Sequence, residues 1–112
     1  MNNELLLLVL KELTKTNETI EPSQEVSNFW ATGKKYFIRT VTMHVTGELV
    51  SICDKEIHLK TAAWIADSGR FHEALKTGSF DEVEPFVEDI IVNRGAIVDA
   101  TIWTHDLPVL CK

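Results

Sequence analysis

From residue 36 onward, apolar and β-branched residues alternate with polar ones, which is typical of β-strands. The pattern predicts three successive strands at 36–45, 47–53 and 56–64. Thr46-Gly47 would separate the first two as a turn or bulge, and Asp54-Lys55 would join the next two as a tight hairpin turn. Connections this short predict an antiparallel meander.

The alternation stops after the third strand. Asp67 or Ser68 is a candidate helix N-cap and Gly78 a candidate C-terminal stop, so the sequence predicts a short helix over 69–76. The residues at 79–88 are acidic and include a proline, and we expect a connection there rather than a strand.

Two more strands are predicted at 89–93 and 96–103, with a turn at Arg94-Gly95 between them and a tail from 105 onward. We expect Gly95 to supply a positive φ angle in this turn, and Arg94 to project from it.

The chain begins with a leucine-rich segment, which predicts a helix over 3–15, followed by a polar arm that extends to residue 35. The apolar run at 5–10 is too short to cross a bilayer, and Glu4 rather than a base precedes it, so we expect neither a signal peptide nor a membrane span. We therefore place the protein in the cytoplasm. The broad apolar stripe of this helix needs a covering surface, which favours a homo-oligomer.

Together these elements predict a mainly β protein with an N-terminal helix. Five short antiparallel strands tend to close into a small barrel, here with a short helix inserted between the third and fourth strands. The expected organisation is an N-terminal helix and arm at 1–35 and a barrel domain at 36–112.

Charge narrows the choice of ligand. The chain has 17 acidic residues against 11 Lys and Arg residues, a net charge of −6. Because general affinity for nucleic acid comes from Lys and Arg at phosphates, a nucleic-acid or nucleotide ligand would have to bind at a local site.

The sequence favours a non-catalytic protein without a cofactor. The four histidines are scattered without metal-ligand spacing, and no nucleophile motif, dinucleotide fingerprint or phosphate-binding loop is present. Cys53 and Cys111 form no Cys-x-x-Cys pair, and we expect two free thiols.

The order of the predicted elements resembles that of Sm-like proteins. Gly47 and Leu49 followed by Asp54 and then Ile57-His58-Leu59 resemble the first Sm motif, with His58 where the family has Asn, and Arg94-Gly95 resembles the second. The resemblance implies an SH3-like barrel, assembly into a homo-oligomeric ring, and contact with RNA through loops that carry Asp54, His58, Arg94 and Gly95.

The chain is also similar to members of a small family found in phages and bacterial genomes. The segments that carry this similarity are 36–42, 62–67, 69–71 and 94–96. This similarity suggests a phage origin, and hence the cytoplasm of a bacterial host, but implies no activity.

A second candidate site lies in the inserted segment. Trp64, Asp67, Arg70 and Phe71 could form a nucleobase pocket in which an aromatic ring stacks and Arg70 binds phosphate. Alternatively, the two aromatic residues hold the inserted helix against the barrel and Asp67 caps it.

Three functions are compatible with these observations. The first is an oligomeric Sm-like protein that binds RNA or a nucleotide at ring-lining or inter-subunit loops. The second is a sponge for small signalling nucleotides, used against host defence, with pockets near Trp64 and Arg70. The third is a purely structural or protein-interaction subunit.

Overall fold

The computed structural model describes residues 29–112, and the helix predicted over 3–15 lies outside them. The chain divides into two units at Trp30/Ala31, and every described strand belongs to the unit Ala31–Lys112.

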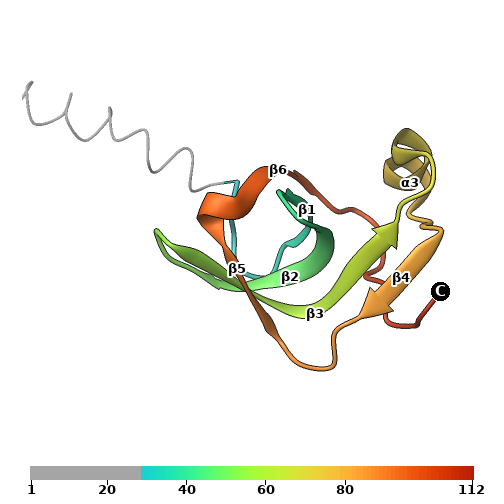
Figure 1. Ribbon diagram of the computed structural model, residues 1–112. Coiled ribbons are helices and arrows are strands. Elements are labelled where there is room, and N and C mark those ends of the chain that lie inside the picture. The colour runs from blue at the N-terminus through green and yellow to red at the C-terminus, as the bar shows by residue number, and fades with distance from the viewer. Residues whose placement is uncertain (1–28) are drawn as a thin grey trace, which may run out of the picture. The chain divides into compact units, whose positions relative to one another are not determined.

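This unit is mainly β, with one six-stranded antiparallel sheet and one short α-helix (Figure 1). In chain order its elements are β1 (Lys35–Thr40), β2 (His44–Ile52), β3 (Glu56–Asp67), α3 (Phe71–Thr77), β4 (Glu82–Pro85), β5 (Ile90–Asn93), the 3-10 turn η1 (Arg94–Ala96) and β6 (Ile97–Ile102).

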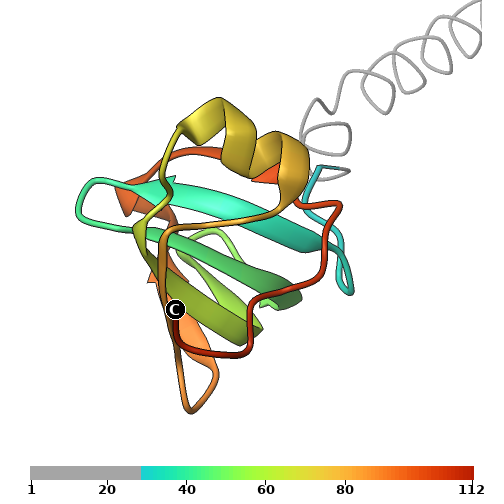
Figure 2. The ribbon, with the colours of Figure 1, turned by 90° about the vertical axis from the view of Figure 1, so that its right-hand side faces the viewer.

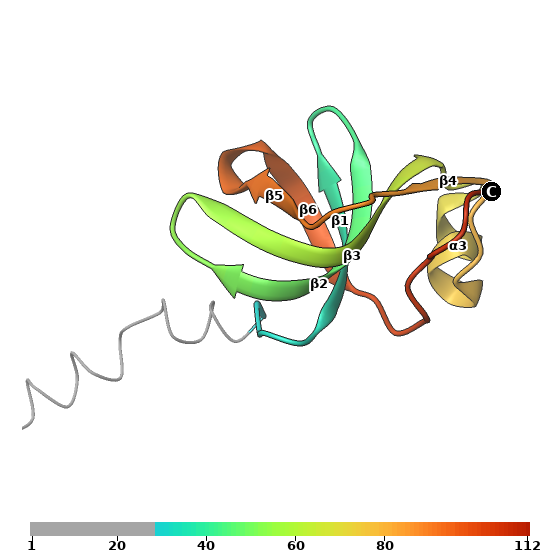
Figure 3. The same cartoon turned by 90° about the horizontal axis from the view of Figure 1, so that it is seen from below.

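The sheet runs in the order β4-β3-β2-β1-β6, and β5 pairs with β3 beside this path. The long strand β3 therefore has two partners on this side: its N-terminal half pairs with β5 and its C-terminal half with β4. Thr61 adopts a positive φ of 50° between the two halves, and β3 bends along its length in Figure 3. The expectation of a five-stranded barrel is thus wrong in strand number, and the sheet is open.

The additional strand is β4, in the acidic segment that we expected to be a connection. Val83 is buried between the exposed Glu82 and Glu84, which is the alternation of a strand with one covered face. Pro85 is tolerated because it is the last residue of the strand. Backbone hydrogen bonds between Val83 and Lys112, at 3.0 Å in both directions, cover the outer edge of β4.

The first predicted strand is in fact two strands with a turn between them. The Thr40 hydroxyl accepts hydrogen bonds from the N–H groups of Thr42 and Met43 and donates one to the Met43 carbonyl, which stabilises the turn despite the β-branched composition. Of the two features expected at Thr46-Gly47, a turn or a bulge, the structure has the irregularity and not the turn: β2 continues through both residues, and its register with β3 shifts between Thr46 and Glu48. A side chain on Gly47 would meet Leu59 of β3, with its Cβ only 3.0 Å away, so this glycine permits close approach of two strands.

The sheet is covered on both faces. On one face lie the buried side chains of Tyr36, Ile38, Val45, Leu49, Ile57 and Leu59. On the other, α3 lies across the sheet (Figure 2) over a second buried cluster made by Phe37, Ala63, Ile65, Ala74, Phe80, Val83 and Trp103. Burial on both faces explains why β1 contains a continuous apolar run rather than an alternating one.

The predicted helix is confirmed to within two residues, but its predicted N-cap is wrong. Arg70 holds the N-cap position and makes no side-chain capping bond, whereas Asp67 accepts from the Gly69 N–H at 2.8 Å in the turn before it. Gly78 ends α3 in the left-handed conformation, with its N–H bonded to the Ala74 carbonyl.

Both cysteines are free thiols, as expected. Cys53 is exposed in the turn after β2 rather than inside a strand, and Cys111 is exposed near the Glu84 carboxylate. The hydrogen bond to Glu84 raises the pKa of the Cys111 thiol above its ordinary value.

Candidate ligand-binding pocket

The β2–β3 turn and η1 meet at one end of the sheet. The backbone N–H of Arg94 donates to the Lys55 carbonyl at 2.9 Å, and the Arg94 guanidinium donates to the Cys53 carbonyl at 2.7 Å. These two bonds connect segments that lie about forty residues apart in the chain. Asn93 caps η1, since its side-chain oxygen accepts from the Gly95 N–H at 2.8 Å.

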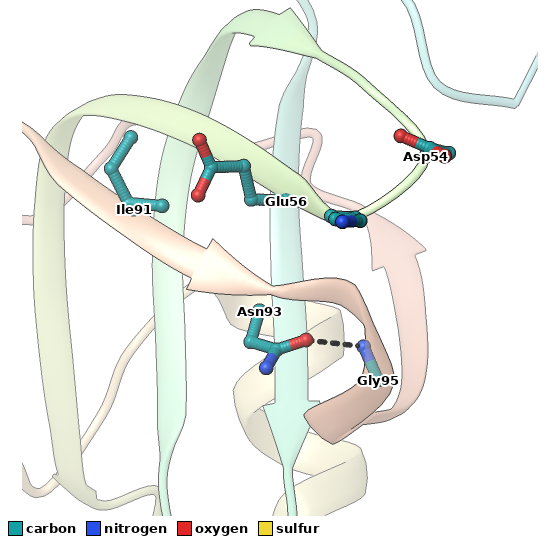
Figure 4. A pocket seen from close by; sticks show the side chains of 6 residues that line it. Asp54, Glu56, Ile91, Asn93 and Gly95 are labelled. Carbon is teal, nitrogen blue, oxygen red and sulfur yellow. Dashed lines mark hydrogen bonds between the residues drawn. The ribbon is translucent and has the colours of Figure 1, made fainter.

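A pocket of about 500 Å³ lies at this junction, and Figure 4 shows its lining side chains. Its lining residues are Asp54, Lys55, Glu56, Ile91, Asn93 and Gly95. Glu56 pairs with Asn93 across β3 and β5, and His58 pairs with Ile91, so these four side chains share one face of the strand pair.

The polar groups of the pocket are mixed in charge. Two acidic residues, Asp54 and Glu56, flank Lys55 in the chain, and Ile91 contributes apolar surface with 55% of its area exposed. Arg94 adds no lining surface, since its guanidinium is bonded to the turn carbonyl. Such a pocket can accept hydrogen bonds from amino groups and contact a flat apolar surface at the same time.

Three of the predicted site residues come together here: Asp54 and Gly95 line the pocket, and Arg94 holds its two walls together. His58 lies two residues beyond Glu56 on β3, outside the lining. The ring of His58 is 2.8 Å from the Asp89 carboxylate, so it pairs with the residue before β5 rather than with Asp54.

The positive φ expected for Gly95 is wrong. Among residues 29–112, the glycines with positive φ are Gly33, Gly69 and Gly78. The connection between β5 and β6 is a 3-10 turn with ordinary backbone angles. The hydrogen bond from the Gly95 N–H to the Asn93 side chain stabilises this turn, so a positive φ at Gly95 is not needed.

The other two predicted site residues lie elsewhere. Trp64 belongs to the far half of β3, paired with Val45 and Glu84, with 42% of its surface exposed. Arg70 precedes α3 and is absent from the lining of the pocket.

Arg39, and not Arg70, packs over the Phe71 ring: the Arg39 guanidinium lies 4.7 Å from the ring centroid. Phe71 also contacts Phe37 of the buried cluster, at a centroid separation of 5.9 Å. Phe71 therefore holds α3 against the sheet, which agrees with the Phe71 part of the alternative to a nucleobase pocket; the Asp67 part is wrong, because Asp67 does not cap α3.

Lys55, Glu56, Ile91 and Asn93 line the pocket, although none of them was predicted from the sequence. One signal was available for Asn93: a side-chain amide two residues before a glycine in a turn is a common local cap. No such signal exists for Glu56 or Ile91, because their proximity depends on the register between β3 and β5.

No family model, curated protein or solved structure matches this chain. Within residues 29–112, no three His, Cys, Asp or Glu side chains are arranged to hold a metal ion. No helix in the same range has the length and apolarity required to cross a bilayer.

Proposed function

We propose that this protein is a non-catalytic, oligomeric Sm-like domain that binds RNA or a nucleotide at the pocket between the β2–β3 turn and η1. One observation carries the proposal: Asp54, Arg94 and Gly95, drawn from two motifs of the sequence, meet at one end of the β3–β5 pair, and His58 follows on β3. The order of the elements, with a helix inserted after β3 and a tight connection before the last strand, supports that class, and β4 is an addition to its expected five strands.

The lining chemistry supports a nucleobase as the recognised group. The carboxylates of Asp54 and Glu56 can accept from exocyclic amino or ring N–H groups, and the Asn93 amide nitrogen can donate to a base carbonyl. The exposed surface of Ile91 offers contact to the face of the base, and Lys55 offers a cation to phosphate. Because acids outnumber the cation in this lining, the pocket suits one or a few nucleotides better than a long polyanion.

The open edge of β6 supports oligomerisation. β6 ends the sheet path and pairs only with β1 among the described strands, which leaves half of its backbone groups facing outward. Val98 and Ile102 are 63% and 38% exposed on the same strand. An edge with exposed apolar residues is a template for pairing with a second copy.

Titration measures the proposed activity directly. Single-stranded RNA homopolymers and a panel of mononucleotides and cyclic nucleotides would be added to the full chain, with binding followed by calorimetry. Binding should weaken by about 1–3 kcal/mol in Glu56→Gln, the scale of a charge-assisted contact. Arg94→Ala should also weaken binding, because it removes the hydrogen bond to the Cys53 carbonyl that holds the two walls of the pocket together. Glu82→Gln, which removes an equal charge from β4, is the matched control. The proposal fails if no ligand binds at millimolar concentration, or if Glu82→Gln weakens binding as much as Glu56→Gln.

A further inference from the structure

A second, apolar groove of about 450 Å³ lies between the β1–β2 turn and β5. Its lining residues are Thr40, Thr42, Met43, Val45, Phe86, Ile90, Ile91, Val92, Asn93 and Ala96, and none of them is charged. Met43 and Phe86 are 40% and 38% exposed, although both are large and apolar. Exposed methionine and aromatic side chains at a groove are typical of surfaces that bind other chains.

The groove follows the free edge of β5. All four residues of this strand line it, and since side chains alternate between faces, a groove that meets every residue must run along the backbone. The Arg94 N–H donates to the Lys55 carbonyl, and in an antiparallel pair every second residue makes such bonds to the partner strand. Val92 and Ile90 therefore also direct their backbone groups toward β3. The N–H and C=O groups of Ile91 and the N–H of Asn93 consequently point away from β3, where no described strand pairs with them.

The connection beside the groove is acidic. Phe86 and Ile90 both line the groove, and the residues between them include Glu88 and Asp89 and no Lys or Arg. A segment that enters the groove therefore meets an apolar floor, the outward backbone groups of β5 and a negative rim. Electrostatic complementarity favours a partner with positive charge.

We propose that the β5 edge and this groove bind an extended segment of a partner protein in which apolar and basic side chains alternate. The segment adds a strand beside β5, hydrogen-bonds to the backbone of Ile91 and Asn93, and inserts apolar side chains between Met43 and Phe86. Its Lys or Arg side chains face the acidic rim. A second copy of this chain fits less well, because the exposed edge strand β6 has one acid, Asp99, and no base.

The site is distinct from the nucleotide pocket, although both meet at Ile91 and Asn93. Substitutions at Met43 and Phe86 touch the groove alone, so this inference and the proposed nucleotide function can fail separately.

Synthetic nonapeptides test the inference by calorimetry with the full chain. The probe peptide alternates valine and lysine; a second replaces lysine with glutamate, and a third carries an N-methyl group on its central amide. The first should bind one to one, at least about tenfold more tightly than the second, and less tightly in high salt. N-methylation should remove most of the affinity, because it blocks a backbone donor.

Phe86→Lys and Met43→Lys should each weaken the binding of the valine–lysine peptide by about tenfold or more. Val87→Lys is the matched control, because Val87 is 96% exposed, lies outside the groove lining and adds the same charge to the rim. Circular dichroism of each variant establishes that the fold is retained. Amide exchange at Ile91 and Asn93 should slow in the complex.

Three outcomes would overturn the inference: no peptide binds at millimolar concentration, the glutamate peptide binds equally well, or Val87→Lys weakens binding as much as Phe86→Lys. If light scattering instead shows a self-associated species that Phe86→Lys dissociates, a second copy occupies the groove and the proposed partner is wrong.

Discussion

Arg94 and Cys53 form a direct link between the two walls of the candidate pocket: the Arg94 guanidinium donates to the Cys53 carbonyl oxygen at 2.7 Å. The acceptor is a backbone group of the β2–β3 turn, and the donor follows β5, so the bond fixes the turn against η1. Arg94 thus has a structural contact that an arginine merely projecting from a loop would lack.

Arg94→Ala should lower the free energy of unfolding by about 1 kcal/mol, the usual net value of a partly exposed hydrogen bond. Arg94→Lys should recover part of this loss, because an ammonium group can reach a carbonyl but lacks the planar fork. Urea denaturation of the wild type and both variants measures the difference. An unchanged midpoint in Arg94→Ala would mean that the bond contributes nothing to stability.

Two glycines should respond differently to alanine. Gly78 has a φ of 76°, and an added Cβ would lie 2.5 Å from the His105 ring, so Gly78→Ala should cost about 2 kcal/mol or more. Gly95 has ordinary backbone angles and would meet only the Asn93 side chain, at 3.2 Å, so Gly95→Ala should cost less than about 1 kcal/mol. Thermal denaturation of both variants shows which substitution is more destabilising. A larger loss of stability in Gly95→Ala than in Gly78→Ala would contradict the backbone geometry of η1.

Thr46→Val should leave the protein as stable as before or stabilise it by up to about 1 kcal/mol. The Thr46 side chain is fully buried on β2 between β1 and β3, and its hydroxyl oxygen has no hydrogen-bond partner. Valine has nearly the same shape and removes the unsatisfied group. Thr46→Ser, which keeps the hydroxyl and loses a methyl group, is the control and should be destabilising; a destabilised Thr46→Val would imply that the hydroxyl has a partner in solution.

Asp99 should contribute to the acid dependence of stability. Hydrogen bonds from the Arg39 guanidinium, at the Nε and Nη2 atoms, lower the pKa of this carboxyl below its ordinary value of 3.8. Because the folded-state pKa is the lower one, the stabilisation is present above 3.8 and disappears as the pH falls through the folded pKa. The effect should be small, since both side chains are largely exposed.

Denaturation at intervals from about pH 2 to about pH 6 measures this dependence. Asp99→Asn should reduce the loss of stability on the acid side of this range relative to the wild type. Glu82→Gln provides a comparison with a carboxylate on another strand. Identical pH profiles for Asp99→Asn and the wild type would show that the ion pair with Arg39 does not stabilise the fold.

Much of the β structure was predictable from the sequence. Alternating β-branched residues located most of β2, β3, β5 and β6, and the Asp54-Lys55 turn was correctly placed. The local sequence is sufficient to locate these strands, because each has apolar residues concentrated on one face or a clear turn signal at its end. The errors fall where two local effects compete. The hydrogen bonds of the Thr40 hydroxyl stabilise a turn within a segment of strand-forming residues. In β4, the buried Val83 lies between two glutamates, and the acidic composition favoured a connection over a strand.

The amino-acid sequence by itself determined the class of structure, the inserted helix and the identity of the residues near the two tight turns. Only the tertiary structure decided that Glu56, Ile91 and Asn93 meet Asp54 in one pocket, and that β5 presents a free edge beside an apolar groove. The reason is physical: propensity and capping act over a few residues, whereas strand register brings together positions some forty residues apart. That register is set by the burial of side chains on both faces of the sheet, and no single segment of the sequence contains it.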